Sequence, residues 1–197
     1  MRALAKLMVA ASMTAAFSIN AEAGLVGKTL DATYYHPDLS VPYDRAFFAP
    51  QSFTVADGIE TIGIVEGVTA LITDFSDSRL TITLNTVLDA PTWNTTSFNG
   101  ILFKLQSPGI LGIASAVTDS TTSLSGFDNS RVSFTDGTLG INWSGLSYTN
   151  GQQVVVDFTF QTSAATLASA VPETSSSLAL LAGLGLFGLV ARRRLMH

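Results

Sequence analysis

The chain has 197 residues, of which 47% are hydrophobic and 13% are charged, with a formal net charge of −5 and no cysteine. So much apolar material excludes a wholly disordered chain, because its burial can offset the entropy lost on folding. The lack of cysteine excludes disulfides, thiolate zinc sites and cysteine nucleophiles. The length is typical of one domain of about 150 residues with additional segments at its ends.

The N-terminal segment, residues 1–23, has the order of a secretory signal peptide. Arg2 and Lys6 precede an uncharged apolar run over residues 7–19. As a membrane anchor this run is too short, because thirteen helical residues span only about 20 Å of a hydrocarbon core of about 30 Å. We therefore expect signal peptidase to remove it. The residues that define the predicted cleavage site are Ala21, Ala23 and Gly24.

Residues 24–162 alternate apolar and polar side chains, the pattern typical of strands rather than helices. In the run 154–160, for example, Val156 and Phe158 share one face and Asp157 lies on the other. Asp-Gly and Asn-Gly pairs between such runs tolerate the positive φ of tight hairpins. The pattern predicts an all-β domain, an antiparallel β-sandwich of jelly-roll type, with an up-and-down barrel as the alternative.

One face of each predicted strand is expected to form the hydrophobic core. A one-residue error in register would expose Phe158 and bury Asp157, so these two residues test the prediction. The predicted core contains Phe53, Val55, Ile82, Leu84, Phe103, Phe134, Trp143, Val156 and Phe158.

The C-terminal part begins with a Ser- and Ala-rich linker, residues 163–176, followed by an uncharged apolar run over residues 177–191. Arg192, Arg193 and Arg194 come directly after this run and predict a stop-transfer signal with the basic tail, residues 192–197, in the cytoplasm. We expect a transmembrane helix over residues 177–191. Its fifteen residues are short for a full span, which favours temporary anchorage.

The segment Val171-Pro172-Glu173-Thr174 stands before the apolar run and is expected to be extended, since proline resists helix. Together with the helix and the arginines, it resembles the PEP-CTERM sorting signal of Gram-negative bacteria. Pro172 and Glu173 match the family's Pro-Glu-Pro, and Thr174 replaces the second proline. The resemblance covers about the last 27 residues. A plain single-pass tail anchor is the alternative.

This resemblance implies that an exosortase, a transpeptidase-like membrane enzyme, recognises and removes the tail. Before this cleavage, the precursor would be anchored in the inner membrane. After it, the mature protein would reach the outer surface or the extracellular matrix. Proteins of this family are often tied to exopolysaccharide and biofilm. The central domain also loosely resembles the secreted β domains that commonly precede this tail, in residues 34–39, 98–100 and 126–134.

The charge of the expected mature part, residues 24–171, limits the classes of molecule that it is expected to bind. It contains 13 Asp and Glu against 5 Lys and Arg, a formal charge of −8. Nucleic acids and anionic membrane surfaces need basic patches, so both are unexpected partners. Ser and Thr make up 37 of these residues, which is typical either of solvated strand faces or of a surface that is O-glycosylated or adheres to polysaccharide.

Candidate catalytic residues are few. His36 is the one histidine in residues 24–171, which excludes a multi-histidine metal site there, and no G-x-S-x-G motif supplies a serine nucleophile. Glycan hydrolysis needs two nearby carboxylates, and either Asp74 with Asp77 or Glu60 with Glu66 would be the pair. With so many carboxylates such pairs arise by chance, and we expect His36 to be a packing residue.

Asp119, Asp128 and Asn129 surround a loop that could supply oxygen ligands to calcium. The same residue types are equally expected in turns, and no D-x-D-x-D-G loop is present. We therefore expect neither a metal nor another cofactor.

The aromatic residues suggest a different role. Trp93 follows Pro91 in a turn-like segment and is predicted to be exposed, where it would stack on a sugar ring. Trp143 is in phase with Ile141 and is expected in the core. The sequence favours a non-catalytic exported cell-surface or matrix protein associated with exopolysaccharide. The alternative is a carbohydrate-binding module or carbohydrate-active enzyme on a jelly-roll scaffold.

Overall fold

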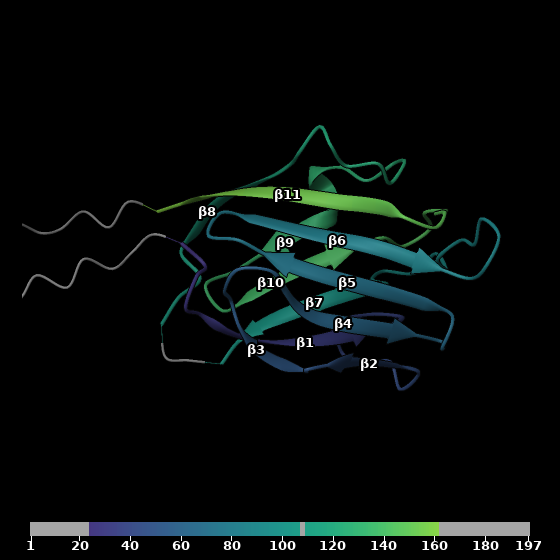
Figure 1. Cartoon of the computed structure of the whole chain (residues 1–197), viewed down its shortest axis with the longest axis horizontal. Coiled ribbons are helices and arrows are strands. Elements are labelled where there is room, and N and C mark those ends of the chain that lie inside the picture. The colour runs from purple at the N-terminus through teal and green to yellow at the C-terminus, as the bar shows by residue number, and fades with distance from the viewer. Residues whose placement is uncertain (1–23, 107–108, 162–197) are drawn as a thin grey trace, which may run out of the picture. The chain divides into compact units, whose positions relative to one another are not determined.

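Two antiparallel sheets pack face to face in the computed structural model of the chain, which describes residues 24–106 and 109–161 (Figure 1). One sheet contains β1 (Thr29–Tyr35), β3 (Ser52–Thr54), β7 (Gly100–Leu105), β9 (Val132–Phe134) and β10 (Thr138–Asn142). The other contains β2 (Ala46–Ala49), β4 (Ile59–Val65), β5 (Thr69–Phe75), β6 (Arg79–Thr86), β8 (Ile113–Thr118) and β11 (Gln152–Phe160). The strand orders are β3-β1-β7-β10-β9 and β2-β4-β5-β6-β11-β8, and a short 3₁₀ helix, η1 (Asn129–Arg131), precedes β9. The predicted all-β sandwich is confirmed, in place of the barrel alternative.

The predicted targeting segments lie outside the described residues. The chain divides into two compact units, residues 1–162 and 163–197, and the described residues belong to the first. Gly24 is the first described residue, and the backbone N–H of Leu25 donates to the Asp77 carbonyl at 2.9 Å. Among the described residues, the structure contains no helix with the length and apolar character needed to cross a membrane. The predictions on which the structure is silent concern Ala21, Ala23, Val171, Pro172, Glu173, Thr174, Arg192, Arg193 and Arg194.

The alternating pattern of β6 gives this strand one buried face, whereas β11 buries Val154, Val155 and Val156 in a row before the alternation resumes at Asp157. Ile82 and Leu84 are fully buried, whereas Thr83 is half-buried on the outer face. In β11, Phe158 is 5% exposed and Asp157 is half-buried on the other face, which confirms the predicted register. Each such apolar side chain stabilises the fold by about 1.5–3 kcal/mol through burial.

Eight of the nine predicted core residues are buried, and Phe134 is the exception at 37% exposed. Phe134 pairs with the buried Leu139 of β10, so both lie on the same face of the sheet. However, β9 is the edge strand of its sheet, and no further strand covers Phe134 from the outer side. Position at an edge, rather than an error in alternation, explains why this prediction was wrong.

The two ends of the sandwich differ in how the chain closes them. At one end, β4 and β6 finish and β5 and β11 begin, with Gln152 of β11 paired with Leu84 of β6. At the opposite end β11 finishes, and Asp157 is paired with Arg79 at the start of β6 (Figure 1). The connection from β6 to β7, residues 87–99, crosses between the sheets at the first of these ends. This connection positions the candidate site.

Candidate functional site

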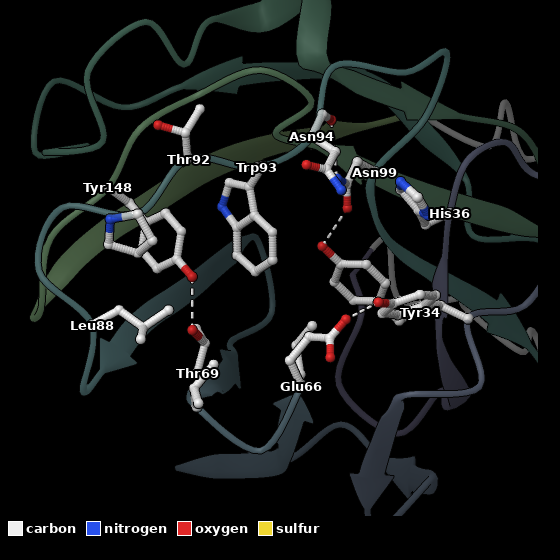
Figure 2. A pocket seen from close by; sticks show the side chains of 14 residues that line it. Tyr34, His36, Glu66, Thr69, Leu88, Thr92, Trp93, Asn94, Asn99 and Tyr148 are labelled. Atoms are coloured by element: carbon white, nitrogen blue, oxygen red, sulfur yellow. Dashed lines mark hydrogen bonds between the residues drawn. The ribbon is translucent and has the colours of Figure 1, made fainter.

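Residues of the β6–β7 connection form one wall of a pocket of about 150 Å³. The floor is aromatic, and a mostly exposed rim surrounds it. Figure 2 shows the indole of Trp93 projecting between Tyr148 and Thr69 on one side and Tyr34 and Glu66 on the other. The floor is lined by Tyr34, Tyr43, Trp93 and Tyr148, and the rim by Glu66, Leu88, Thr92 and Asn94.

Trp93 is buried at 8% exposed, so the prediction of an exposed aromatic platform was wrong. Its backbone N–H donates to the Leu146 carbonyl at 2.9 Å, which draws the connection against the loop before β11. The indole then stacks on Tyr148, with ring centroids 4.7 Å apart and planes at 10°, and on Trp143 at 5.5 Å. Protein rings therefore occupy the stacking surface that we expected a sugar to use.

Tyr34, in β1, links the floor to the core through its hydroxyl. It accepts a hydrogen bond from Trp143 Nε1 at 2.7 Å and donates one to Asn99 Oδ1 at 2.7 Å. Asn99 Nδ2 in turn donates to the Asn94 carbonyl at 3.1 Å, which ties the rim to the floor. Burial raises the pKa of Tyr34 well above its ordinary value, so this hydroxyl stays neutral and keeps its donor proton.

A second chain of hydrogen bonds supports the opposite side of the pocket. Tyr148 Oη lies 2.7 Å from Thr69 Oγ1, at the start of β5. Thr69 donates to Thr86 Oγ1 at 3.1 Å, and Thr86 donates to the Val68 carbonyl at 3.1 Å. Because Thr69 uses its own proton on Thr86, Tyr148 is the donor to Thr69. Burial raises the pKa of Tyr148, which keeps that proton in place.

Glu66 supplies the charge at the rim. It follows β4 with a φ of 54°, in the left-handed region, and its carboxylate accepts hydrogen bonds from Tyr43 Oη and from Arg45 Nη1, the latter at 3.0 Å. The hydrogen bond from Tyr43 is the main cause that lowers the pKa of Glu66, and it raises the pKa of Tyr43. Glu66 is therefore ionised at neutral pH, with both oxygens engaged.

Two residues of the pocket have a buried nitrogen without a hydrogen-bond partner. These nitrogens are Trp93 Nε1 and His36 Nε2, and they are two of the four such side-chain atoms in the described part of the chain. An unsatisfied buried polar group costs about 1–3 kcal/mol, so native structures contain few of them. Half of them gather at this one pocket. His36 is half-buried and packs edge-on against Tyr43 with ring centroids 5.3 Å apart, as expected for a packing residue.

Neither predicted carboxylate pair lines the pocket, since Glu66 is there without Glu60, Asp74 or Asp77. Glu60 and Glu66 lie at opposite ends of β4, and Glu60 accepts hydrogen bonds from the backbone N–H groups of Phe75 at 2.6 Å and Ala56 at 3.1 Å. Burial is the main cause that raises the pKa of Glu60. Asp77 lies beside the first described residues, with Oδ1 3.4 Å from the backbone nitrogen of Val26.

The candidate calcium ligands act as turn residues. Asp119 Oδ1 accepts hydrogen bonds from Thr121, and Asp128 Oδ1 accepts hydrogen bonds from Ser130. These bonds lower the pKa of both aspartates. Asn129 Oδ1 accepts a hydrogen bond from the backbone N–H of Thr118 at 2.6 Å. Over residues 24–106 and 109–161, no group of three His, Cys, Asp or Glu side chains is placed to hold a metal ion.

Comparisons with protein-family models, with curated proteins and with solved structures found no match. The residues that line the pocket therefore provide the evidence for the kind of ligand that it suits. An aromatic floor with amide, hydroxyl and carboxylate groups around it suits a small polar ring, which has apolar faces and a polar edge. The sequence indicated Trp93, Tyr34 and Tyr148 as aromatic residues able to stack on a sugar but not Asn99, because only long-range pairing brings Asn99 next to Tyr34 and Asn94.

Proposed function

We propose that this protein is a non-catalytic, exported cell-surface or extracellular-matrix protein that associates with exopolysaccharide through the aromatic pocket. The observation that carries the proposal is the coincidence, in one pocket, of an aromatic floor with two unpartnered buried nitrogens. A ligand rich in hydroxyl groups can supply the hydrogen-bond partners that these two nitrogens lack.

The pocket volume matches a single sugar ring. An apolar protein cavity of about 150 Å³ is known to accommodate benzene, a six-membered ring. The pocket has this volume, and Asn94 and Thr92 stand exposed at its rim. A pyranose ring seated there would turn its C–H groups toward the aromatic floor and its hydroxyls toward the rim. An extended internal segment of a polymer would not fit inside.

The carboxylate in the pocket supports binding rather than hydrolysis. Glycoside hydrolysis commonly uses two carboxyl groups, one of which donates a proton and therefore needs a raised pKa. Among the described residues that line the pocket, Glu66 is the one carboxylate, and its pKa is lowered. Both of its oxygens already accept hydrogen bonds. We assign Glu66 the role of holding the rim through Tyr43 and Arg45.

The route to the cell surface is the second part of the proposal. Signal peptidase would cut before Gly24, which becomes the first residue of the mature protein. An exosortase-type enzyme would cut near Val171-Pro172-Glu173-Thr174, while Arg192–Arg194 hold the tail on the cytoplasmic side. A jelly-roll-like connectivity is the finer fold that we propose, because the connection from β6 to β7 and that from β10 to β11 both pass between the two sheets.

A glycan array tests the binding site. The probes are neutral-hexose, uronic-acid and N-acetylhexosamine oligosaccharides, applied to the secreted mature protein. Asn94→Ala removes a rim amide, and Trp93→Phe keeps an aromatic ring at this position, although a smaller one, while removing the indole N–H. Each variant is expected to weaken binding about tenfold, the effect of one lost hydrogen bond of about 1.4 kcal/mol. Phe47→Ala, on exposed β2, is the matched control.

Binding to no probe, or unchanged binding by both pocket variants, would overturn the pocket as a glycan site. A reducing-sugar assay on the bound probes tests the non-catalytic role, since release of sugar would contradict it. Mass spectrometry of the surface-exposed form tests the route. We expect a first residue of Gly24 and no peptide from the tail, and replacing Pro172 and Glu173 with alanine should trap a longer membrane-bound precursor.

A further inference from the structure

A second hollow of about 450 Å³ lies beside the pocket at the same end of the sandwich. Val68 and Thr69, in the turn from β4 to β5 and the start of β5, line both the pocket and the hollow. The hollow is larger than the pocket and more open. The two recesses are therefore neighbours that share one wall.

Two consecutive residues of the chain line different recesses. Val87 lines the hollow and Leu88 lines the pocket. Val87 is 84% exposed, the most exposed large hydrophobic side chain in the described part of the chain. Its position is fixed, because its backbone N–H donates to the Val68 carbonyl at 3.1 Å and that of Leu88 donates to Thr86 Oγ1 at 3.2 Å. The fold thus holds an apolar side chain open to solvent at the edge of a recess.

Ile64, Val68 and Ala70 also line the hollow, and its polar lining groups are the amides and hydroxyls of Thr69, Asn85, Thr86 and Asn150. Asn85 is exposed at the end of β6, and Asn150 Oδ1 accepts a hydrogen bond from the backbone N–H of Thr86 at 2.9 Å. No charged side chain is among the described residues that line the hollow. An apolar contact flanked by amides and hydroxyls suits a neutral sugar, whereas a uronic acid would find no cation in the hollow to pair with its carboxylate.

We propose that the hollow is a second subsite, which holds the units that follow the ring seated in the pocket, so that the protein binds the end of a neutral polysaccharide chain. This inference rests on the proposed function. The terminal ring enters the pocket, and the chain leaves it over the wall formed by Val68 and Thr69. Val87 then packs against the C–H face of the next ring, and Asn85 is within the same hollow to pair with its hydroxyls.

The test is a chain-length series. The probes are the monosaccharide and the two- to five-unit oligomers of the neutral hexose that gives the strongest array signal, titrated calorimetrically into the secreted mature protein. We expect affinity to rise about tenfold or more between one and three units and then to level off. Val87→Ser combined with Asn85→Ala should abolish this rise and leave the monosaccharide affinity unchanged. Val117→Ser, at an exposed valine of β8, is the matched control.

The outcomes separate the two proposals. Equal affinity for every length, or an undiminished rise in the double variant, would overturn the second subsite and leave the pocket standing. Preference for a uronic-acid oligomer over the neutral series would also overturn it. Failure of every oligomer and of the monosaccharide to bind would overturn the proposed function itself. Loss of monosaccharide affinity in Trp93→Phe but not in the Val87→Ser, Asn85→Ala variant would support both.

Discussion

Two aromatic clusters occupy different regions of the sandwich interior and are built differently. The first consists of phenylalanines with ring centroids 5.0–6.3 Å apart, two of the three pairs edge-on, and it has no polar atom in any ring. The second has similar spacings but carries hydroxyl and N–H groups, which hydrogen bonds tie to both sheets. The members are Phe53, Phe75 and Phe103 in the first, and Tyr34, Trp93, Trp143 and Tyr148 in the second.

The difference shows how one fold uses separate groups of side chains for stability and for a candidate binding site. Apolar rings without directional bonds fill the interior by packing alone, at the density of a well-packed core. Rings with polar tips are held at fixed positions by their partners, so they can border a pocket without collapsing into it. We therefore expect the phenylalanine cluster to contribute mainly to folding and the tyrosine–tryptophan cluster to ligand binding.

The largest expected effect is on stability, from Phe103→Ala in the first cluster. Phe103 is fully buried against Phe53 and Phe75, so its removal leaves a cavity and should reduce the free energy of unfolding by about 3–5 kcal/mol. Urea denaturation measures this loss. Phe134→Ala, at the exposed edge position, is the control and should cost less than about 1 kcal/mol. Equal losses in the two variants would contradict the distinction between core and edge.

Tyr34→Phe should have an intermediate effect on stability and a clear effect on binding. The change leaves Trp143 Nε1 and Asn99 Oδ1 without their buried partner, which should reduce the free energy of unfolding by about 1–3 kcal/mol. Because Asn99 also holds the rim through Asn94, sugar affinity should fall as well. Tyr35→Phe is the control, since successive side chains of a strand point to opposite faces. A stability loss without any loss of affinity would show that Tyr34 belongs to the folding cluster.

Sequence patterns predicted the two sheets well and the pocket poorly, for a physical reason. Burial in β6 repeats every second residue, and in β11 Val156 and Phe158 are buried on either side of the half-buried Asp157, so Ile82, Val156 and Phe158 are visible as core residues in the local sequence. Trp93 has no such pattern, because its burial depends on the backbone hydrogen bond with Leu146 and on stacking with Tyr148, more than fifty residues away. Long-range contacts of this kind leave no local periodicity.

A smaller difference in stability is expected between variants of the two tryptophans of the second cluster. Trp143 donates its N–H to Tyr34, whereas the N–H of Trp93 has no partner. Trp143→Phe should therefore destabilise the protein by about 1–2 kcal/mol more than Trp93→Phe, because it alone breaks a buried hydrogen bond. Chemical denaturation of both variants measures the difference. Equal stabilities would show that Trp93 Nε1 is already satisfied in the ligand-free protein.

The smallest expected effect is a pH dependence at the pocket rim. The lowered pKa of Glu66 means that its contribution to stability is present above its ordinary, unfolded pKa and is lost as the pH falls through the folded value. Glu60 has the opposite sign, because its raised pKa makes protonation favour the folded state. We expect Glu66→Gln to flatten the acid side of the stability profile, measured by urea denaturation below pH 5. An unchanged profile would contradict this assignment.

The length and direction of β11 have a consequence for how the protein meets its surroundings. The strand has nine residues, begins beside the pocket and ends where the chain continues toward residue 162 (Figure 1). At about 3.3 Å per residue it separates the two points by roughly 25–30 Å. The last described residues of the sandwich therefore lie at the end opposite the pocket. A ligand bound in the pocket and any contact made through the last described residues would therefore use opposite ends of the sandwich.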